Sequence, residues 1–156
     1  MSMTRKFNSS LLLWLCASAF FLSAVAARSE SGDMKLHAQL IWGTNEPKSP
    51  DPKHKLVGKE LEKKLKNSPF KWEYYFEVSD EKFNLPLQKE KTVNMSKDCA
   101  IAVRNLGGSV VEFRLFGKGK LVNKITQPLP KGQILVEGGN ADNATAWFVV
   151  LKSIDD

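Results

Sequence analysis

The clearest signal in the chain is an alternation of apolar and polar residues, which predicts half-buried β-strands. Residues 35–42 alternate cleanly, and their apolar face carries Leu36, Ala38, Leu40 and Trp42. Residues 70–79 repeat the pattern with larger side chains, and Tyr75 is the one aromatic residue on their polar face. We therefore expect two strands here, with Tyr75 exposed to solvent as a candidate ligand contact.

The second half of the chain reads as a series of short strands separated by turns. Gly107-Gly108 and Gly117-Lys118-Gly119 suit tight hairpins, because glycine adopts the positive φ values that such turns demand. The expected strands cover residues 91–96, 99–106, 110–116, 120–127, 133–137 and 144–152. About seven strands at this spacing predict a mainly β fold, either an antiparallel β-sandwich or a small barrel.

Residues 55–66 have a helical period. Val57, Leu61 and Leu65 recur every four residues, and Leu56 widens the same apolar stripe. Glutamates and lysines in favourable i,i+4 order support this helix. The preceding residues, 43–54, contain three prolines and show no period, so we expect a loop.

The last expected strand is apolar on both of its faces. Ala146, Phe148 and Val150 alternate there with Trp147, Val149 and Leu151. A strand of this kind needs cover on both sides. We expect one face to meet an opposing sheet and the other to lie under the amphipathic helix or, failing that, under a second protein chain.

Residues 1–27 have the parts of a secretory signal. A positively charged start precedes an apolar run of 12 residues at 11–22, and small residues then permit cleavage after Ala26 or Ala27. From Leu11 to Ala27 the chain runs 17 residues without charge, at the lower limit for crossing a bilayer, which favours a cleaved signal over a membrane anchor. We expect residues 28–156 to be a single exported domain, periplasmic or extracellular, that is not an integral membrane protein.

Removal of the signal changes the charge and the cysteine count. The formal charge falls from +6 for 156 residues to +4 for the remaining 129, and Cys99 becomes the single cysteine. We expect Cys99 to be a buried, inert thiol, and a disulfide between two chains is the alternative. Asn94 and Asn143 begin formal N-glycosylation sequons, whose use depends on the source organism.

Residues that would carry catalysis are sparse. His37 and His54 have no cysteine or acidic residue at metal-ligand spacing, and no serine occupies a Gly-x-Ser-x-Gly setting. The glycines and lysines at 117–120 lack the spacing of a phosphate-binding loop and precede a strand. We therefore expect no enzyme, no metal and no cofactor, with a small hydrolase as the enzymatic alternative.

Charge is the remaining signal. Residues 48–71 carry eight lysines against three acids. Lysine strongly outnumbers arginine, which favours diffuse attraction over bidentate phosphate recognition, and export argues against nucleic acid. The candidate anion contacts are Lys53, Lys55, Lys59, Lys63, Lys64 and Lys66.

Two function classes follow from these observations. The leading hypothesis is a non-enzymatic protein that contacts another envelope or extracellular protein, because the last strand is apolar on both faces and no catalytic group of residues is evident. The second is a binding module for an anionic polysaccharide or a membrane surface, which would use the six lysines.

Overall fold

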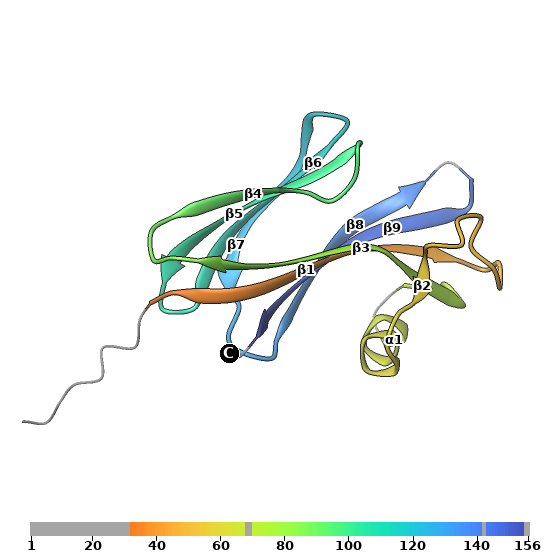
Figure 1. The fold of residues 1–156 in the computed structure, drawn as a ribbon, viewed down its shortest axis with the longest axis horizontal. Coiled ribbons are helices and arrows are strands. Elements are labelled where there is room, and N and C mark those ends of the chain that lie inside the picture. Colours follow the sequence, from red (N-terminus) through yellow and green to blue (C-terminus); the bar gives the residue numbers. More distant parts are fainter. Residues whose placement is uncertain (1–31, 68–69, 142, 155–156) are drawn as a thin grey trace, which may run out of the picture.

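Strands dominate the structure, which is a computed structural model and describes residues 32–67, 70–141 and 143–154. The expected signal segment at 1–27 lies outside these residues. Within them, nine strands form two antiparallel sheets that lie face to face (Figure 1). The prediction of an antiparallel β-sandwich is confirmed, with more strands than expected.

The first sheet, called sheet A, has five strands in the order β2-β3-β1-β9-β8. These strands cover Lys55–Leu56, Tyr74–Leu85, Met34–Thr44, Thr145–Ile154 and Ile134–Ala141. The second sheet, called sheet B, has four strands, β4-β5-β6-β7, which cover Glu90–Asn94, Cys99–Gly107, Val110–Gly117 and Lys120–Pro128. Sheet B is a meander, whereas sheet A joins the two ends of the described chain, since β1 pairs with both β3 and β9.

The main core lies between the two sheets. Inward-facing residues of β1 meet those of β5 and β6, and Leu36, Ile101 and Phe113 are fully buried there. On β9, Val149 and Leu151 belong to the same core. The inner face of the last strand therefore meets the opposing sheet, as the alternation predicted.

A buried amide closes one end of this core. The Nδ2 group of Asn105 donates to the carbonyl oxygens of Gly32 (2.6 Å) and Leu85 (3.1 Å), and its Oδ1 accepts the N–H of Gly107 (2.9 Å). From Gly107 to Ser109 the chain has positive φ, which glycine tolerates without strain. The expected glycine hairpin is therefore a two-residue turn, Gly108-Ser109, next to a register shift at Gly107 that a core side chain anchors.

The helix α1, Lys59–Lys66, lies on the outer face of sheet A (Figure 1). Val57 and Leu65 are buried there in a second apolar cluster that includes Phe148 of β9, and Leu61 packs against it. The prediction that the helix covers the second apolar face of the last strand is confirmed. A second chain is not required at that face.

The helix begins later than the sequence pattern indicated. Lys55 and Leu56 form the edge strand β2, which pairs with β3, and Gly58 is the N-cap of the helix. The expectation that Leu56 widens the apolar stripe is wrong, since this residue is 62% exposed. Backbone pairing with β3 holds residues 55–56 extended and turns Leu56 away from the helix stripe.

The expectation that Tyr75 is exposed is also wrong, because 1% of its surface is accessible. Tyr75 lies on the outer face of sheet A, in the cluster under α1, with its ring 6.2 Å from that of Phe148. Lys71 and Glu73 made this face look polar in the sequence. Both precede β3, which begins at Tyr74, and Tyr75 is buried because the cluster under α1 covers its end of the face, although Glu77 lies on the same face.

Candidate functional site

Ser49, Asp51 and His54 lie together in the proline-rich loop between β1 and β2. The Oγ atom of Ser49 is 2.7 Å from Nδ1 of His54, and Nε2 of the same ring is 3.8 Å from Oδ2 of Asp51. These are the residue types of a hydrolytic triad, and sequence reasoning did not predict the group. The signal that could have revealed it is the spacing, since all three fall within six residues.

Hydrogen bonds within this group indicate a structural role. Ser49 Oγ also accepts the N–H of Asp51 (3.3 Å), and Asp51 Oδ1 accepts the N–H of Lys53 (2.9 Å). In a catalytic triad the carboxylate hydrogen-bonds the histidine ring, and the 3.8 Å separation here is too long for such a bond. The three side chains therefore order the turns around His54.

His37 lies apart from this loop, on β1. Its Nε2 atom is 3.1 Å from Oδ2 of Asp80 on the neighbouring strand β3. Among residues 32–67, 70–141 and 143–154, no three His, Cys, Asp or Glu side chains gather as metal ligands. The contact of His37 with Asp80 joins two neighbouring strands and is a cross-strand pair.

The structure brings together three of the six lysines predicted as anion contacts. Lys59, Lys63 and Lys66 lie along one side of α1 and line a shallow hollow. Lys64 lines another hollow, between the helix and sheet A, and its Nζ is 3.7 Å from Oε1 of Glu60. The helical lysines therefore lie on two sides of the helix.

Lys53 and Lys55, the other two predicted contacts, precede the helix and are exposed. An acidic residue partly neutralises the helical group, because Nζ of Lys66 donates to Oε1 of Glu62 (2.7 Å). This hydrogen bond raises the pKa of Lys66. The six lysines thus do not form one uncompensated basic surface.

Cys99 begins β5 and is 8% exposed, so the predicted burial is confirmed. Burial raises the pKa of its thiol to about 11, which keeps the thiol protonated at neutral pH. Because the thiolate is the reactive form, this environment supports the inert thiol over a disulfide between chains. The pairing state in solution stays a prediction.

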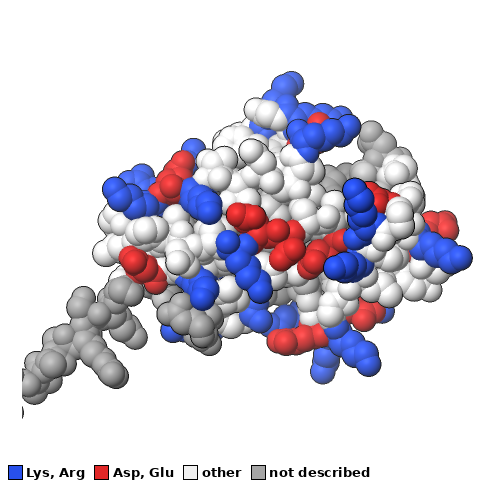
Figure 2. All heavy atoms as spheres, in the orientation of Figure 1, with Lys and Arg blue, Asp and Glu red and all other residues white. Residues whose placement is uncertain are grey.

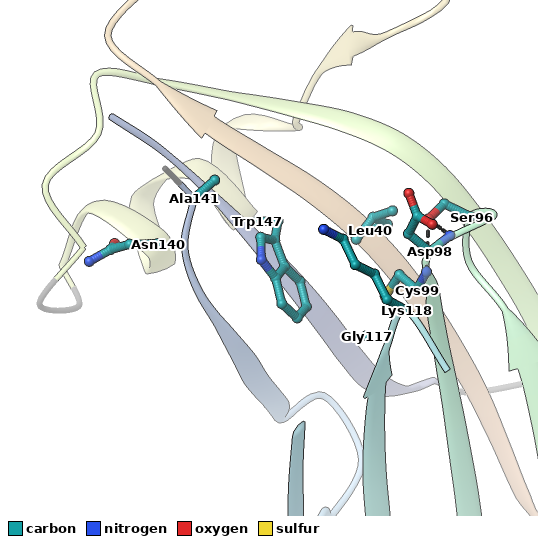
Figure 3. A pocket seen from close by; sticks show the side chains of 9 residues that line it. All are labelled: Leu40, Ser96, Asp98, Cys99, Gly117, Lys118, Asn140, Ala141 and Trp147. Atoms are coloured by element: carbon teal, nitrogen blue, oxygen red, sulfur yellow. Dashed lines mark hydrogen bonds between the residues drawn. The ribbon is translucent and has the colours of Figure 1, made fainter. Parts of the chain in front are cut away.

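A cleft of about 490 Å³ opens between the two sheets at one end of the sandwich (Figure 3). Its apolar surface comes from Leu40 of β1 and Trp147 of β9. The remaining lining residues are Ser96, Asp98, Cys99, Gly117, Lys118, Asn140 and Ala141. Figure 3 shows the side chains of Lys118 and Trp147 reaching toward each other from the two sheets.

Hydrogen bonds between and within turns hold one wall of the cleft. The N–H of Lys118 donates to the carbonyl oxygen of Asp98 (2.7 Å), which joins the β6–β7 turn to the β4–β5 turn. Ser96 Oγ accepts the N–H groups of Asp98 (3.2 Å) and Cys99 (3.0 Å). Ser96 is therefore engaged by its own turn, and the lining residues supply an apolar floor with a polar rim.

Strand β7 forms an edge of sheet B, since it pairs with β6 alone, and most of its residues are exposed. Near its start, Leu121 is 54% exposed and Val122 is 53% exposed. Lys118 and Lys120 precede this pair in the sequence. Figure 2 shows basic side chains over the end of the molecule where Figure 1 places the β6–β7 turn. Sequence reasoning missed this surface because an apolar residue on a strand does not reveal whether another strand covers it.

Comparison with protein-family models, curated proteins and solved structures gave no match to this chain. No helix of the described residues is long and apolar enough to cross a membrane. The function must therefore be inferred from the geometry of the molecule itself.

Proposed function

We propose that this protein acts by binding another protein, without catalysis, through the β6–β7 hairpin and the free edge of β7. The observation that carries the proposal is the pair of exposed aliphatic residues on an edge strand, Leu121 and Val122. An edge strand presents backbone N–H and C=O groups that have no ladder partner. Exposed apolar side chains beside those groups add surface that a partner removes from water.

The other edges offer less to a partner. Strand β2 has two residues, so although its Leu56 is exposed, it offers few backbone groups for a partner strand to pair with. Strand β4 has five residues, of which Val93 is buried. Strand β8 is longer, but its exposed residues are Gly138 and Asn140, which present little apolar surface. Strand β7 combines nine residues with two exposed aliphatic side chains.

The partner is an envelope or extracellular protein if residues 1–27 direct export. The charged start, apolar core and small residues at the cleavage position support export. Sequencing of the mature N-terminus tests this part of the proposal, and the expected first residue is Ala27 or Arg28. An intact Met1 on the purified native protein would contradict it.

The anion-binding alternative has weaker support. Glu60 and Glu62 pair with two of the helical lysines, Lys64 and Lys66, at the surface that this alternative requires. Exposed pairs of this kind reduce the local field that would attract an anionic polymer. The protein contact depends on the exposed apolar surface of Leu121 and Val122, which ion pairing does not reduce, so the hairpin is the better candidate.

A photoreactive amino acid at position 121 tests the proposed surface. Irradiation in the native host should give one discrete covalent adduct with a partner, because Leu121 lies within the contact. The matched control carries the same group in place of Leu56, which is exposed on the edge of sheet A. Equal adducts at both positions, or none at 121, would contradict the proposal.

The partner identified in that way permits a direct affinity measurement. The double variant Leu121→Ser with Val122→Ser should raise Kd at least about tenfold, because it removes two aliphatic side chains whose burial favours binding. Leu56→Ser should leave Kd unchanged. An unchanged Kd in the double variant would remove the hairpin from the contact.

A further inference from the structure

We infer that the partner contributes an extended acidic segment, which adds to β7 as a fifth strand of sheet B. This inference rests on the proposed function, since it names the chemistry of the partner at the same surface. Strand addition uses the free backbone groups of an edge, and side-chain pairs then decide which segment fits. The outer face of sheet B supplies those pairs.

Outward-facing residues of sheet B stand in rows across its four strands. One row consists of Glu90, Arg104, Glu112 and Thr126. The next row consists of Thr92, Ala102, Arg114 and Lys124. The third consists of Asn94, Ala100, Phe116 and Leu121. A fifth strand on β7 would extend the first two rows by one residue each, and the register shift at Val122 offsets the third row from them.

Charges of opposite sign pair across the first two rows. The guanidinium of Arg114 contacts Oε2 of Glu90, two strands away, across the row position of the small Ala102. The Nζ atom of Lys124 is 2.9 Å from Oε2 of Glu112, and this hydrogen bond lowers the pKa of that carboxyl. Lys124 is therefore the charged residue of these two rows that lies on the free edge, and it shares its charge with Glu112 on the inner side.

The rest of this edge is also basic. Lys118 and Lys120 are exposed in the hairpin, and Lys124 is exposed in the strand. Glu137 of β8 faces β7 from sheet A, where its carboxylate accepts a hydrogen bond from Nδ2 of Asn123 (2.8 Å). An acidic residue beside Lys124 would continue the alternation of charge, whereas a basic residue would oppose it.

A second copy of this chain is a poorer occupant of the edge. Antiparallel pairing of two β7 strands along their full length, Lys120–Pro128, would centre on Lys124 and set both copies of that side chain opposite each other. Like charges directly opposite in a sheet are destabilising. Pro128 also lacks an N–H to donate at the far end of the strand. The edge thus resists self-pairing and complements an acidic strand.

The third row adds an apolar requirement. Leu121 stands beside Phe116, which is partly exposed, and beyond Phe116 lies Ala100. A residue of the added strand opposite Leu121 would cover this end of the row. We therefore expect a segment that is apolar near the hairpin and acidic opposite Lys124.

Synthetic nine-residue peptides with blocked ends test the inference. One peptide alternates valine with glutamate, and its matched control has lysine in place of glutamate. Fluorescence anisotropy with the purified protein should show at least about tenfold tighter binding of the glutamate peptide, weakening between roughly 50 and 500 mM salt. Methylation of alternate peptide nitrogens should abolish binding, because it removes the backbone hydrogen bonds of an added strand. Equal binding of both peptides, or of the methylated form, would overturn the inference.

Variants of the protein place the binding on β7. Lys124→Gln should weaken binding of the glutamate peptide about two- to fivefold, and Lys124→Glu should make the lysine peptide the better ligand. The matched control is Lys63→Glu on the exposed side of α1, which should change neither affinity. A loss of glutamate-peptide binding in the control instead of in the Lys124 variants would assign the acidic site to the helix.

Vesicles of phosphatidylglycerol provide the competing outcome. Binding of these vesicles that is lost in the Lys124→Glu variant, without binding of the glutamate peptide, would assign the edge to a membrane surface and overturn the inference. An adduct at position 121 with no preference for glutamate would overturn the acidic segment and leave the protein contact standing. No adduct at 121 overturns the protein contact itself.

Discussion

The outer faces of the two sheets meet solvent in opposite ways. At one end of sheet A the outer face is apolar, and α1 covers it there, with Leu65 fully buried in the contact. Among the described residues no helix lies over the outer face of sheet B, which carries rows of charged residues. An apolar sheet face is thus covered by the chain itself, and a bare face is polar. Leu121 and Val122 depart from this rule at the edge of the bare face, where we propose that a partner binds.

Removal of the helix anchor is the strongest test of this contrast. Leu65→Ala should lower the free energy of unfolding by about 2–5 kcal/mol, because it leaves a cavity under α1. The matched control, Leu56→Ala, removes an exposed leucine and should stay within about 0.5 kcal/mol of the wild type. Urea unfolding measures both. Similar losses in the two variants would mean that the helix does not seal the outer face of sheet A.

The thiol of Cys99 reports on the core that separates the two faces. A pKa of about 11 for this thiol, against 9.0 ordinarily, lowers the thiolate fraction near pH 8 about a hundredfold. Alkylation of the native protein should be slower than that of the urea-unfolded protein by at least this factor. Because the folded pKa is raised, stability should fall as pH rises from about 9 toward 11. Fast alkylation of the native protein would show that the core around Cys99 opens readily to solvent.

The hydroxyl of Tyr75 tests how apolar the space under α1 is. It is buried and makes no hydrogen bond of ordinary geometry among the described residues, although the backbone of Trp72 lies near enough to lower its pKa slightly against the larger effect of burial. Tyr75→Phe should therefore change the free energy of unfolding near pH 7 by no more than about 1 kcal/mol, in the stabilising direction. A loss of several kcal/mol would reveal a polar contact under the helix.

Burial also raises the pKa of Tyr75, so the folded protein keeps this proton to a higher pH than the unfolded chain does. Stability should accordingly fall as pH rises above about 10. Urea unfolding near pH 7 and near pH 10.5 should show a smaller fall in Tyr75→Phe than in the wild type. An equal fall would assign the pH dependence to other groups.

Substitutions in the charged rows of sheet B should have the smallest effect among these tests. The hydrogen bond from Lys124 lowers the pKa of the Glu112 carboxyl, so this pair stabilises the fold above the ordinary pKa and loses that effect as pH falls through the lowered value. Titration followed by NMR of the Glu112 carboxyl carbon should show an upward shift of its pKa in Lys124→Met. Lys63→Met is the matched control and should leave the titration unchanged. An unchanged pKa of Glu112 in Lys124→Met would show that the two side chains do not pair in solution.

Much of the fold could be predicted because it depends on local alternation. The two faces of residues 144–152 and the stripe of Val57, Leu61 and Leu65 correctly predicted a strand between a sheet and a helix. The errors arose where pairing decides the outcome. Leu56 is extended because β2 pairs with β3, and Tyr75 is buried because α1 and its cluster cover that part of the sheet face.

The candidate surface could not be predicted, for a related reason. Leu121 and Val122 look like ordinary strand residues, and their exposure follows from the position of β7 at the end of the strand order. Strand order depends on contacts between distant segments, which alternation does not encode. The six lysines were identifiable as charges, and the i,i+4 order already indicated the pairs Glu60–Lys64 and Glu62–Lys66, which the side-chain geometry confirms.

Strand β9 has a consequence for how the protein unfolds. Val149 and Leu151 belong to the core between the sheets, and Phe148 and Val150 belong to the cluster under the helix. Separation of either cluster exposes one side of the same strand, which couples the loss of the helix contact to the loss of the sandwich. We therefore expect a single cooperative unfolding transition, with the amides of β9 among the slowest to exchange with solvent.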